Sequence, residues 1–243
     1  AERSQSTQPD LRGMMVVELP EKNPELLLEL GNALQALPEV EYASISVLGT
    51  PPPGDIGTPT PDFTTLQGYP DSDPGVDMSY LYSLGITGSN IQISDCEYGW
   101  NTTHEDLMDI DWELEFGHTI PWWVADYGWD DHGTAVIGET SAPDNGYGVT
   151  GLVHGAPLKL YPEWSNEVGG RRAESIASAI ANSSVGDVVL LEMQIQASYI
   201  QGSQLFGPAE LDPDIWVVSK MGVDSDVIIV SAAGNGNQNL DSA

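Results

Sequence analysis

His132 is the residue of this 243-residue chain that is best placed to do acid–base chemistry. It is followed by Gly133 and by a run of small and apolar residues up to position 139 at helical spacing, which predicts a buried helix that begins at the histidine. A general base must be held rigidly at the edge of a cleft, and this arrangement meets that requirement. A lone histidine before a buried helix is also a common structural residue, so His132 alone leaves both interpretations open.

An acid and an amide follow apolar segments on either side of this histidine. Asp95 ends the apolar-alternating segment 88–95, and Asn235 lies between two glycines after the apolar segment 226–233. Acid, histidine and amide in this order resemble the subtilisin-like serine proteases, and the resemblance covers roughly residues 60–243. Three further motifs match that family: Gly-Ile-Thr-Gly-Ser-Asn at 85–90, His-Glu-Asp-Leu at 104–107 and Asn-Gly-Tyr-Gly-Val-Thr-Gly at 145–151.

The resemblance implies peptide-bond hydrolysis by a Ser-His-Asp mechanism. Asp95 is then the acid, His132 the base and Asn235 the donor that stabilises the oxyanion. The family usually has Asp-Thr-Gly or Asp-Ser-Gly at the acid, whereas Asp-Cys-Glu stands here, and the loop to His104 is slightly longer than usual. Judged on the residues alone, Asp95 could instead cap a turn, and Asn235 could be an ordinary turn residue.

The location of the nucleophile and the residues that bind substrate are predicted from the same resemblance. The family's serine lies in a Gly-Thr-Ser stretch well beyond the asparagine, so we expect it outside this sequence and expect the chain to be inactive alone. A peptide substrate would add as an extended strand beside the segment after residue 191. The implied substrate-binding residues are Met193, Gln194, Ile195, Ala233 and Gly234.

Metal and thiol chemistry receive little support from the sequence. No spacing of His, Cys and carboxylate residues indicates zinc, and metal ligands are unknown. The resemblance implies no required cofactor, although calcium is common in the family. The single cysteine, Cys96, allows no intramolecular disulfide, and we expect it to be a packed, inert thiol.

The charge balance excludes two classes of partner. There are 37 Asp and Glu residues against 7 Lys and Arg, a net charge of −30, which repels nucleic acid and anionic membranes. There is no apolar run of about 18 residues that could span a membrane. The composition fits a secreted or salt-adapted enzyme, and we expect secretion, although such charge also serves solubility alone. The expected partners are a peptide or protein substrate and the chain's own propeptide.

The chain is predicted to contain two parts and a linker. Residues 1–48 resemble a partial propeptide of the family, with strands at 14–19 and 40–47 around a Leu-rich helix that Asn23 caps. Residues 49–61 carry five prolines and read as a linker, and residues 62–243 as the N-terminal part of the catalytic domain. A small integral subdomain is the alternative interpretation of the first part.

The sequence of residues 62–243 predicts an α/β fold with a doubly wound parallel sheet. Apolar strands at 90–94, 112–118, 157–161, 188–193 and 227–232 alternate with helices at 78–84, 173–181 and 214–221. Aromatic residues crowd the approach to His132 and either wall a substrate cleft or pack a loop: Trp122, Trp123, Tyr127 and Trp129.

Together these observations predict the N-terminal part of a secreted serine endopeptidase. The alternative from another class is a non-catalytic relative, a peptide-binding or scaffold module that never had the serine. An α/β hydrolase is disfavoured because the sequence has no Gly-x-Ser-x-Gly elbow.

Overall fold

The computed structural model describes residues 23–40, 43, 60–108, 110, 112–115, 117–200 and 203–236. The chain divides into two compact units, Ala1–Pro51 and Pro52–Ala243, and each is described by itself. The division falls inside the segment 49–61 that the sequence indicates as a linker.

The first unit contains the predicted Leu-rich helix, α1 (Pro24–Gln35). The Asn23 side chain accepts hydrogen bonds from the backbone N–H groups of Glu25 and Leu26, and Pro24 occupies the first helical position, as an N-cap sequence of this kind favours. Apart from Val40 and Ala43, the two strands predicted around this helix lie outside the described residues. The propeptide-like character of this unit therefore stays a prediction.

The second unit is built on a five-stranded sheet in which every neighbouring pair is parallel. The strands, in spatial order, are β2 (Trp112–Leu114), β3 (Leu158–Pro162), β1 (Ile93–Glu97), β6 (Val188–Leu191) and β9 (Ile228–Ser231). Along the chain, β2 and β3 are added on one side of β1, and β6 and β9 are then added on its other side. The direction in which strands are added therefore reverses between β1 and β6. In open α/β sheets, ligand sites lie at the carboxyl ends of the strands at such a point.

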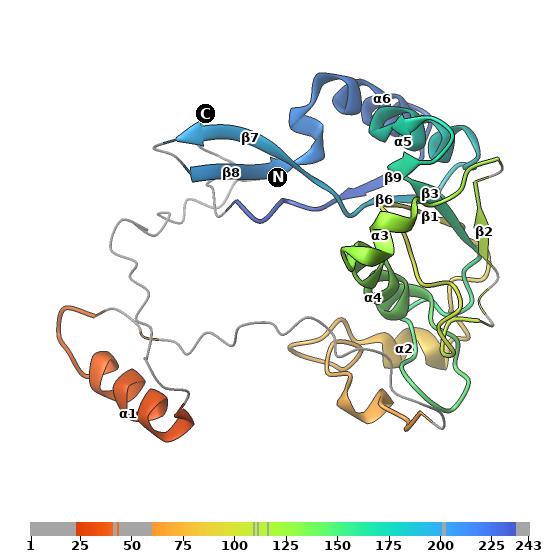
Figure 1. Ribbon diagram of the computed structural model, residues 1–243. Helices are drawn as coiled ribbons and strands as arrows, with labels where there is room; N and C mark the ends of the chain where they lie inside the picture. The colour runs from red at the N-terminus through yellow and green to blue at the C-terminus, as the bar shows by residue number, and fades with distance from the viewer. Residues whose placement is uncertain are drawn as a thin grey trace. The chain divides into compact units, whose positions relative to one another are not determined.

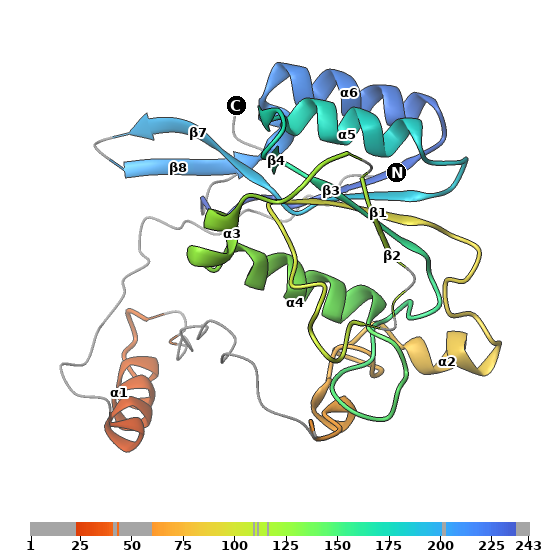
Figure 2. The same cartoon turned by 45° about the vertical axis from the view of Figure 1, so that its right-hand side comes forward.

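Helices cover both faces of this sheet. Helix α4 (Trp129–Ser141) lies on one face, and α5 (Arg172–Ala181) and α6 (Pro213–Asp224) lie on the other (Figures 1 and 2). The predicted doubly wound α/β class is confirmed. Shorter elements surround the sheet: α2 (Met78–Ser83), α3 (Trp122–Asp126), the 3₁₀ turns Thr64–Leu66 and Ala209–Leu211, and the pairs β4 (Trp164–Ser165) with β5 (Gly169–Gly170) and β7 (Gln194–Ile200) with β8 (Ser203–Pro208).

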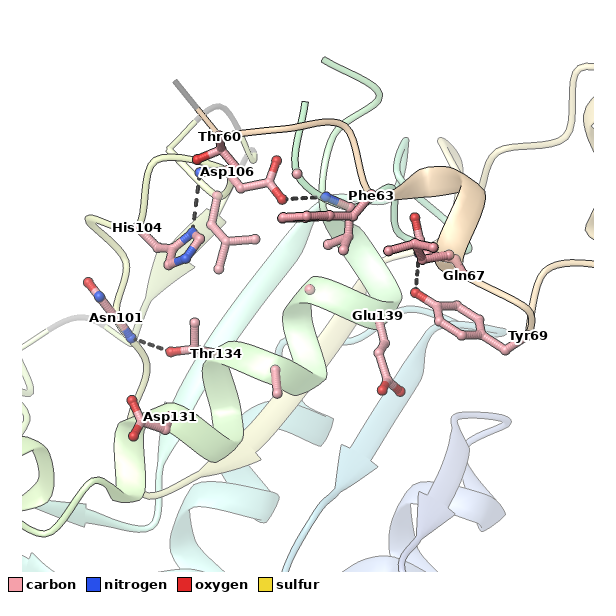
Figure 3. A pocket seen from close by; sticks show the side chains of 16 residues that line it. Thr60, Phe63, Gln67, Tyr69, Asn101, His104, Asp106, Asp131, Thr134 and Glu139 are labelled. Carbon is pink, nitrogen blue, oxygen red and sulfur yellow. Dashed lines mark hydrogen bonds between the residues drawn. The ribbon is translucent and has the colours of Figure 1, made fainter. Parts of the chain in front are cut away.

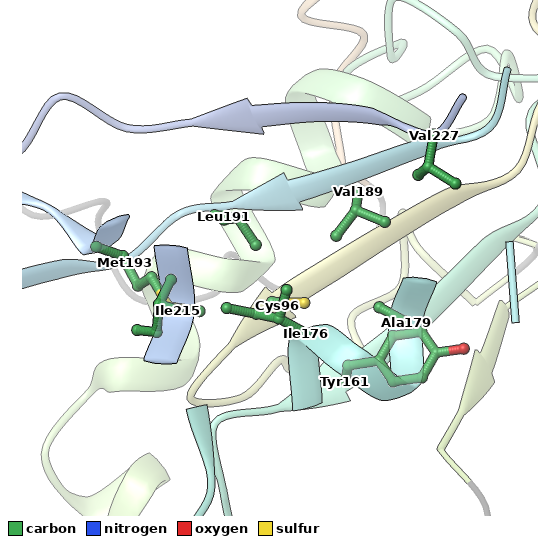
Figure 4. Packing of buried hydrophobic residues seen from close by; sticks show 10 residues of the cluster. Cys96, Tyr161, Ile176, Ala179, Val189, Leu191, Met193, Ile215 and Val227 are labelled. Atoms are coloured by element: carbon green, nitrogen blue, oxygen red, sulfur yellow. The ribbon is translucent and has the colours of Figure 1, made fainter. Parts of the chain in front are cut away.

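The face toward α5 and α6 is a closed apolar core (Figure 4). Val189 and Leu191 of β6 pack there against Ile176 and Ile215, and all four are at most 2% exposed. Cys96 of β1 lies in the same core without exposed surface, and burial raises the pKa of its thiol well above the ordinary value. This burial confirms the expected packing of the cysteine, and a buried thiol with a raised pKa is expected to be inert.

The face toward α4 is covered only in part within the described residues. Ile93, Leu158 and Leu160 pack there against Ile137 of α4. On β9, farther from α4, Ile228 and Val230 are 51% and 46% exposed. By register these two residues share the face of Leu190 and Asp95, so an apolar strip lies uncovered on β9, beside β6 and two strands from β1.

The position of β1 corrects one sequence prediction. The strand was expected at 90–94 with Asp95 at its end, but it runs from Ile93 to Glu97. A turn holds the preceding residues out of the sheet, with the Ile91 N–H donating to the Gly88 carbonyl at 2.9 Å. Because Cys96 packs as a small apolar residue, the strand continues through Asp95, and Glu97 becomes the acid at its carboxyl end.

Candidate active site

His132 and Glu97 form a hydrogen-bonded pair at the carboxyl edge of the sheet. The Nδ1 atom of His132 donates to Oε1 of Glu97 at 2.5 Å. The Glu97 side chain is 3% exposed and the His132 side chain is 60% exposed. A buried carboxylate therefore holds one ring nitrogen of the imidazole while the ring stays accessible from solvent, which is the arrangement of an oriented general base.

Helix α4 brings His132 to β1 because Gly133 has no side chain. The helix begins after Gly128, whose φ is 67°, and His132 lies in its first turn. A Cβ atom on Gly133 would lie 2.3 Å from the Gly99 carbonyl oxygen and 2.8 Å from the Trp100 ring. Only glycine permits this contact between the helix and the loop after β1.

Asp95 does not occupy the predicted position beside the histidine. It is fully buried two residues earlier in β1, and its Oδ2 atom accepts a 2.8 Å hydrogen bond from the Trp100 indole nitrogen. Its other carboxylate oxygen has no hydrogen-bond partner among the described residues. Because Asp95 lies two residues before Glu97 in the strand, it is roughly 6.6 Å farther from the carboxyl edge of the sheet. The predicted pairing of Asp95 with His132 is therefore replaced by the pairing of Glu97 with His132.

Two features of the sequence could have identified Glu97. Glu97-Tyr98-Gly99 has the acid-x-Gly form that the family shows at its acid, which Asp95-Cys96-Glu97 lacks. Counting the loop to His104 from Glu97 instead of Asp95 also shortens it by two residues, which accounts for its apparent excess length.

Burial and hydrogen bonding have opposite effects on the pKa values of Glu97 and His132. Burial raises the pKa of Glu97, and the hydrogen bond from His132 opposes that rise. The bond to Glu97 raises the pKa of His132, because the carboxylate favours the imidazolium. Burial, with the nearby charge of Glu97, raises the pKa of Asp95 well above its ordinary value. Asp95 is thus favoured as a neutral acid beneath a charged pair.

Arg172 links several elements around the His132–Glu97 pair. The sequence did not predict this role. It forms an ion pair with Glu163 and donates to the Gln194 carbonyl at 3.0 Å and to the Tyr98 hydroxyl at 3.1 Å. Burial raises the pKa of Glu163 to about 7, and the charge of Arg172 opposes that rise. Arg172 thereby joins the loop after β1, the hairpin start at Glu163 and the first residue of β7.

The residues of the segment predicted to bind substrate differ in their surroundings. The side chain of Met193 is 3% exposed and belongs to the core, so only its backbone could contact a peptide, and its substrate-binding role stays a prediction. Gln194 begins β7, which pairs along one edge with β8, so a peptide strand could add only at the other edge. Ile195 packs against the same core as Met193.

Asn235 lies beyond the carboxyl end of β9, at the same edge of the parallel sheet as Glu97. It is exposed, and its backbone N–H donates to Oε1 of Gln194 at 2.8 Å. Gly234 has a φ of 84° and packs against Gly207, which permits the turn before the asparagine. Ala233 is also exposed, and the substrate-binding role of Ala233 and Gly234 and the oxyanion role of Asn235 stay predictions.

A cavity of about 600 Å³ lies elsewhere, between the segment 60–69 and α4 (Figure 3). Its lining includes neither Glu97 nor His132, although Ala135 and Glu139 of α4 contribute to it. Beside it, Asp106 accepts hydrogen bonds from the Asn145 side chain and the Val149 N–H at 3.0 and 2.7 Å. The motifs at 104–107 and 145–151 thus bind each other and hold two loops together.

Metal and membrane features are not evident in the described part of the chain. No three His, Cys, Asp or Glu side chains gather there in a group that could hold a metal ion, and calcium binding stays untested. No helix of the described residues is sufficiently long and apolar to cross a bilayer.

Comparison with known proteins supports the protease resemblance. No family model matches the chain. It is 27% identical over 165 residues to the major intracellular serine protease of Bacillus subtilis (strain 168), a match that covers 64% of this chain and 46% of that protein. The resemblance to the subtilisin-like serine proteases is confirmed. The chain spans about half the length of this relative, at 46%.

Two solved structures are similar over part of this subtilisin-like chain. The prenylagaramide maturation protease PagA is 13% identical, with a TM-score of 0.41, and the likeness covers 63% of this chain and 49% of that one. A psychrophilic subtilisin-like protease from an Antarctic Pseudoalteromonas is 21% identical, with a TM-score of 0.36, over 50% of this chain and 30% of that one.

The expectation of secretion is corrected by the curated relative, which is an intracellular protease. That expectation was based on the acidic composition. High negative charge keeps a protein soluble in any aqueous compartment, so it does not indicate secretion.

Proposed function

We propose that this subtilisin-like chain supplies the acid, the base and one oxyanion donor of an intracellular serine endopeptidase. The observation that carries the proposal is the 2.5 Å hydrogen bond between His132 and Glu97. The acid of the mechanism is then glutamate, in place of the aspartate that the resemblance implied. The nucleophilic serine would come from a segment beyond residue 243.

The geometry of the pair supports a defined route for the proton. Glu97 keeps Nδ1 of His132 protonated, so that Nε2 can take the serine proton as the serine oxygen attacks the peptide carbonyl carbon. The imidazolium that forms is stabilised by the Glu97 carboxylate, and it then returns the proton to the leaving amine. Asn235 would donate to the oxygen of the tetrahedral intermediate.

The remaining parts of the proposal concern partners. The substrate would be a peptide or protein segment that adds in extended form at the free edge of β7. The first unit, with its capped helix α1, would serve as an intramolecular propeptide. Neither role requires a metal ion.

The test uses casein as substrate and the full-length gene product, including any segment that follows residue 243. We expect hydrolysis that a serine-directed sulfonyl fluoride blocks. Glu97→Gln should lower kcat by about 10⁴-fold, the loss typical when the acid partner of a catalytic histidine becomes an amide. Asp95→Asn is the matched control, two residues away in the same strand, and should retain most of the activity.

Two outcomes would contradict the proposal. Loss of activity in Asp95→Asn with little change in Glu97→Gln would restore the original choice of acid. Complete lack of inhibitor-sensitive hydrolysis by the full-length protein would favour the alternative function, a peptide-binding module.

A further inference from the structure

Five aromatic side chains form a contiguous cluster next to the His132–Glu97 pair. This aromatic cluster consists of Tyr98, Trp123, Tyr127, Trp129 and Trp164. Its ring centroids lie between 4.6 and 6.5 Å apart, and the contacts are tilted or edge-to-face. The rings come from the loop after β1, from α3, from the start of α4 and from β4, so tertiary structure assembles them.

The aromatic cluster adjoins the catalytic pair through the chain itself. Tyr98 directly follows Glu97, and Trp129 lies three residues before His132, on the same side of α4. The sequence left open whether these aromatic residues pack a loop or line a cleft. Trp164 is 42% exposed and Trp129 43%, so the rings contact one another and also keep part of their surface accessible to solvent.

Several carboxylates lie close in sequence to the residues of the aromatic cluster. Asp126, Asp130 and Asp131 lie in the same two helices as its rings, and Glu167 lies in the turn of the β4–β5 hairpin that carries Trp164. Hydrogen bonds from Thr119 lower the pKa of Glu167 to about 2, so this carboxylate stays ionised.

The cations among the described residues are already paired with carboxylates. The described residues include Lys159, Arg171, Arg172 and Lys220, and each is in an ion pair with a carboxylate. Arg172 is also 5.8 Å from the centroid of the Tyr98 ring, so one ring of the cluster already contacts a cation.

We propose that the aromatic cluster binds a lysine or arginine side chain of the peptide substrate, close to the bond that His132 addresses. The peptide nature of this ligand depends on the proposed function. Exposed indole faces attract cations and also cover the methylene stem of a long basic side chain. The neighbouring carboxylates strengthen the attraction and repel acidic peptides, which an apolar pocket alone would not do.

The experiment measures peptide binding by the 243-residue chain, without hydrolysis. Blocked alanine-based pentapeptides with one central Lys, Arg, norleucine or Glu are titrated, and tryptophan fluorescence reports binding. We expect Lys and Arg to bind roughly three- to thirty-fold more tightly than norleucine, which has the stem of lysine without its charge. The Glu peptide should bind most weakly, and the preference for Lys should shrink as salt is added.

Substitutions show whether the cluster is responsible. Trp164→Leu should reduce the preference for Lys over norleucine at least threefold. Trp216→Leu is the control, because Trp216 is 57% exposed on α6, on the opposite face of the sheet, and it should leave the preference unchanged.

The inference is overturned if norleucine binds as tightly as Lys or if none of the four peptides binds at millimolar concentration. A preference that persists in Trp164→Leu also overturns it. If Trp164→Leu fails to fold, the comparison of peptides on the unsubstituted chain still decides. Lack of hydrolysis by the full-length protein would count against the proposed function alone, because this assay does not depend on catalysis.

Discussion

At the scale of single residues, the site depends on two acids on one face of β1 with different surroundings. Glu97 reaches the edge of the sheet and bonds His132, whereas Asp95 is enclosed and bonds Trp100. Burial favours the neutral form of a carboxyl group, and a hydrogen bond from an imidazole opposes this effect. The two acids therefore support different functions although they are two residues apart.

We predict that Glu97→Gln lowers the pKa of His132. The bond to Glu97 raises this pKa above the ordinary value of 6.5, so the folded protein holds the proton more tightly than the unfolded chain does. The stability that results is fully present below pH 6.5 and is lost as pH rises through the folded pKa. NMR titration of the imidazole in the two proteins measures the change. Asp95→Asn should leave the folded pKa of His132 raised, and an equal fall in both variants would contradict the assigned pairing.

We predict that Asp95 tolerates asparagine but not alanine. Because burial favours the neutral acid, an amide of the same size keeps the acceptor for Trp100 and should change the free energy of unfolding by less than about 1 kcal/mol at pH 5. Alanine leaves a cavity and an unpaired indole N–H, and should cost roughly 2–4 kcal/mol. Denaturant unfolding measures both. Equal losses in the two variants would indicate that Asp95 is ionised in the folded protein.

At the scale of elements, the position of α4 decides whether the pair can form. The first turn of this helix lies against the loop after β1, and the contact occurs at a glycine. Farther along the same helix, Gly138 has room for a methyl group, because a Cβ atom there would have Val149 as its nearest neighbour at an ordinary contact distance of 3.8 Å. The two glycines of α4 are therefore under different constraints.

We predict opposite effects of Gly133→Ala and Gly138→Ala. The first places a methyl group 2.3 Å from the Gly99 carbonyl oxygen, so the helix must shift and stability should fall by roughly 1–3 kcal/mol. The second meets no close atom and should raise stability by up to about 1 kcal/mol through helix propensity. Thermal unfolding of both variants checks the difference. A loss of stability in Gly138→Ala would mean that this face of α4 is more closely packed than described.

At the scale of the whole second unit, the two faces of the sheet differ in how completely they are covered. The face toward α5 and α6 is closed, and the face toward α4 leaves Ile228 and Val230 of β9 about half exposed, at 51% and 46%. Adjacent exposed apolar residues on a sheet favour association or dye binding. The net charge of −30 opposes association through repulsion between molecules.

We predict that the double variant Ile228→Thr, Val230→Thr binds less of a hydrophobic fluorescent dye than the unsubstituted chain. Since both residues are about half exposed, the free energy of unfolding should change by less than roughly 1 kcal/mol. Ile229 between them packs against the core on the other face, so Ile229→Thr should cost roughly 1–3 kcal/mol. Unchanged dye binding in the double variant would place the apolar surface elsewhere.

Local sequence signals determined the class of the fold and the position of the histidine. Apolar runs of strand length and alternation with helices predicted a parallel sheet, and the Gly-rich helix start predicted His132 at its edge. The cap at Asn23 predicted where α1 begins. These features depend on residues close together in the chain, so periodicity and capping chemistry are sufficient to find them.

Only the tertiary structure decided which acid meets the histidine and which aromatic residues meet one another. Asp95 and Glu97 are two residues apart, so their side chains lie on the same face of the strand. Moving the end of the strand by two residues keeps that face, and the alternating pattern therefore could not distinguish the two acids. The pairing was decided by how far β1 extends before its turn and by the approach of α4 at Gly133. Trp164 is 35 positions after Trp129 in the sequence, and their shared contact with Trp123 depends on packing between a hairpin and two helices. Contacts between residues so far apart in the sequence depend on how the elements pack in three dimensions. Local conformational preferences do not specify that packing.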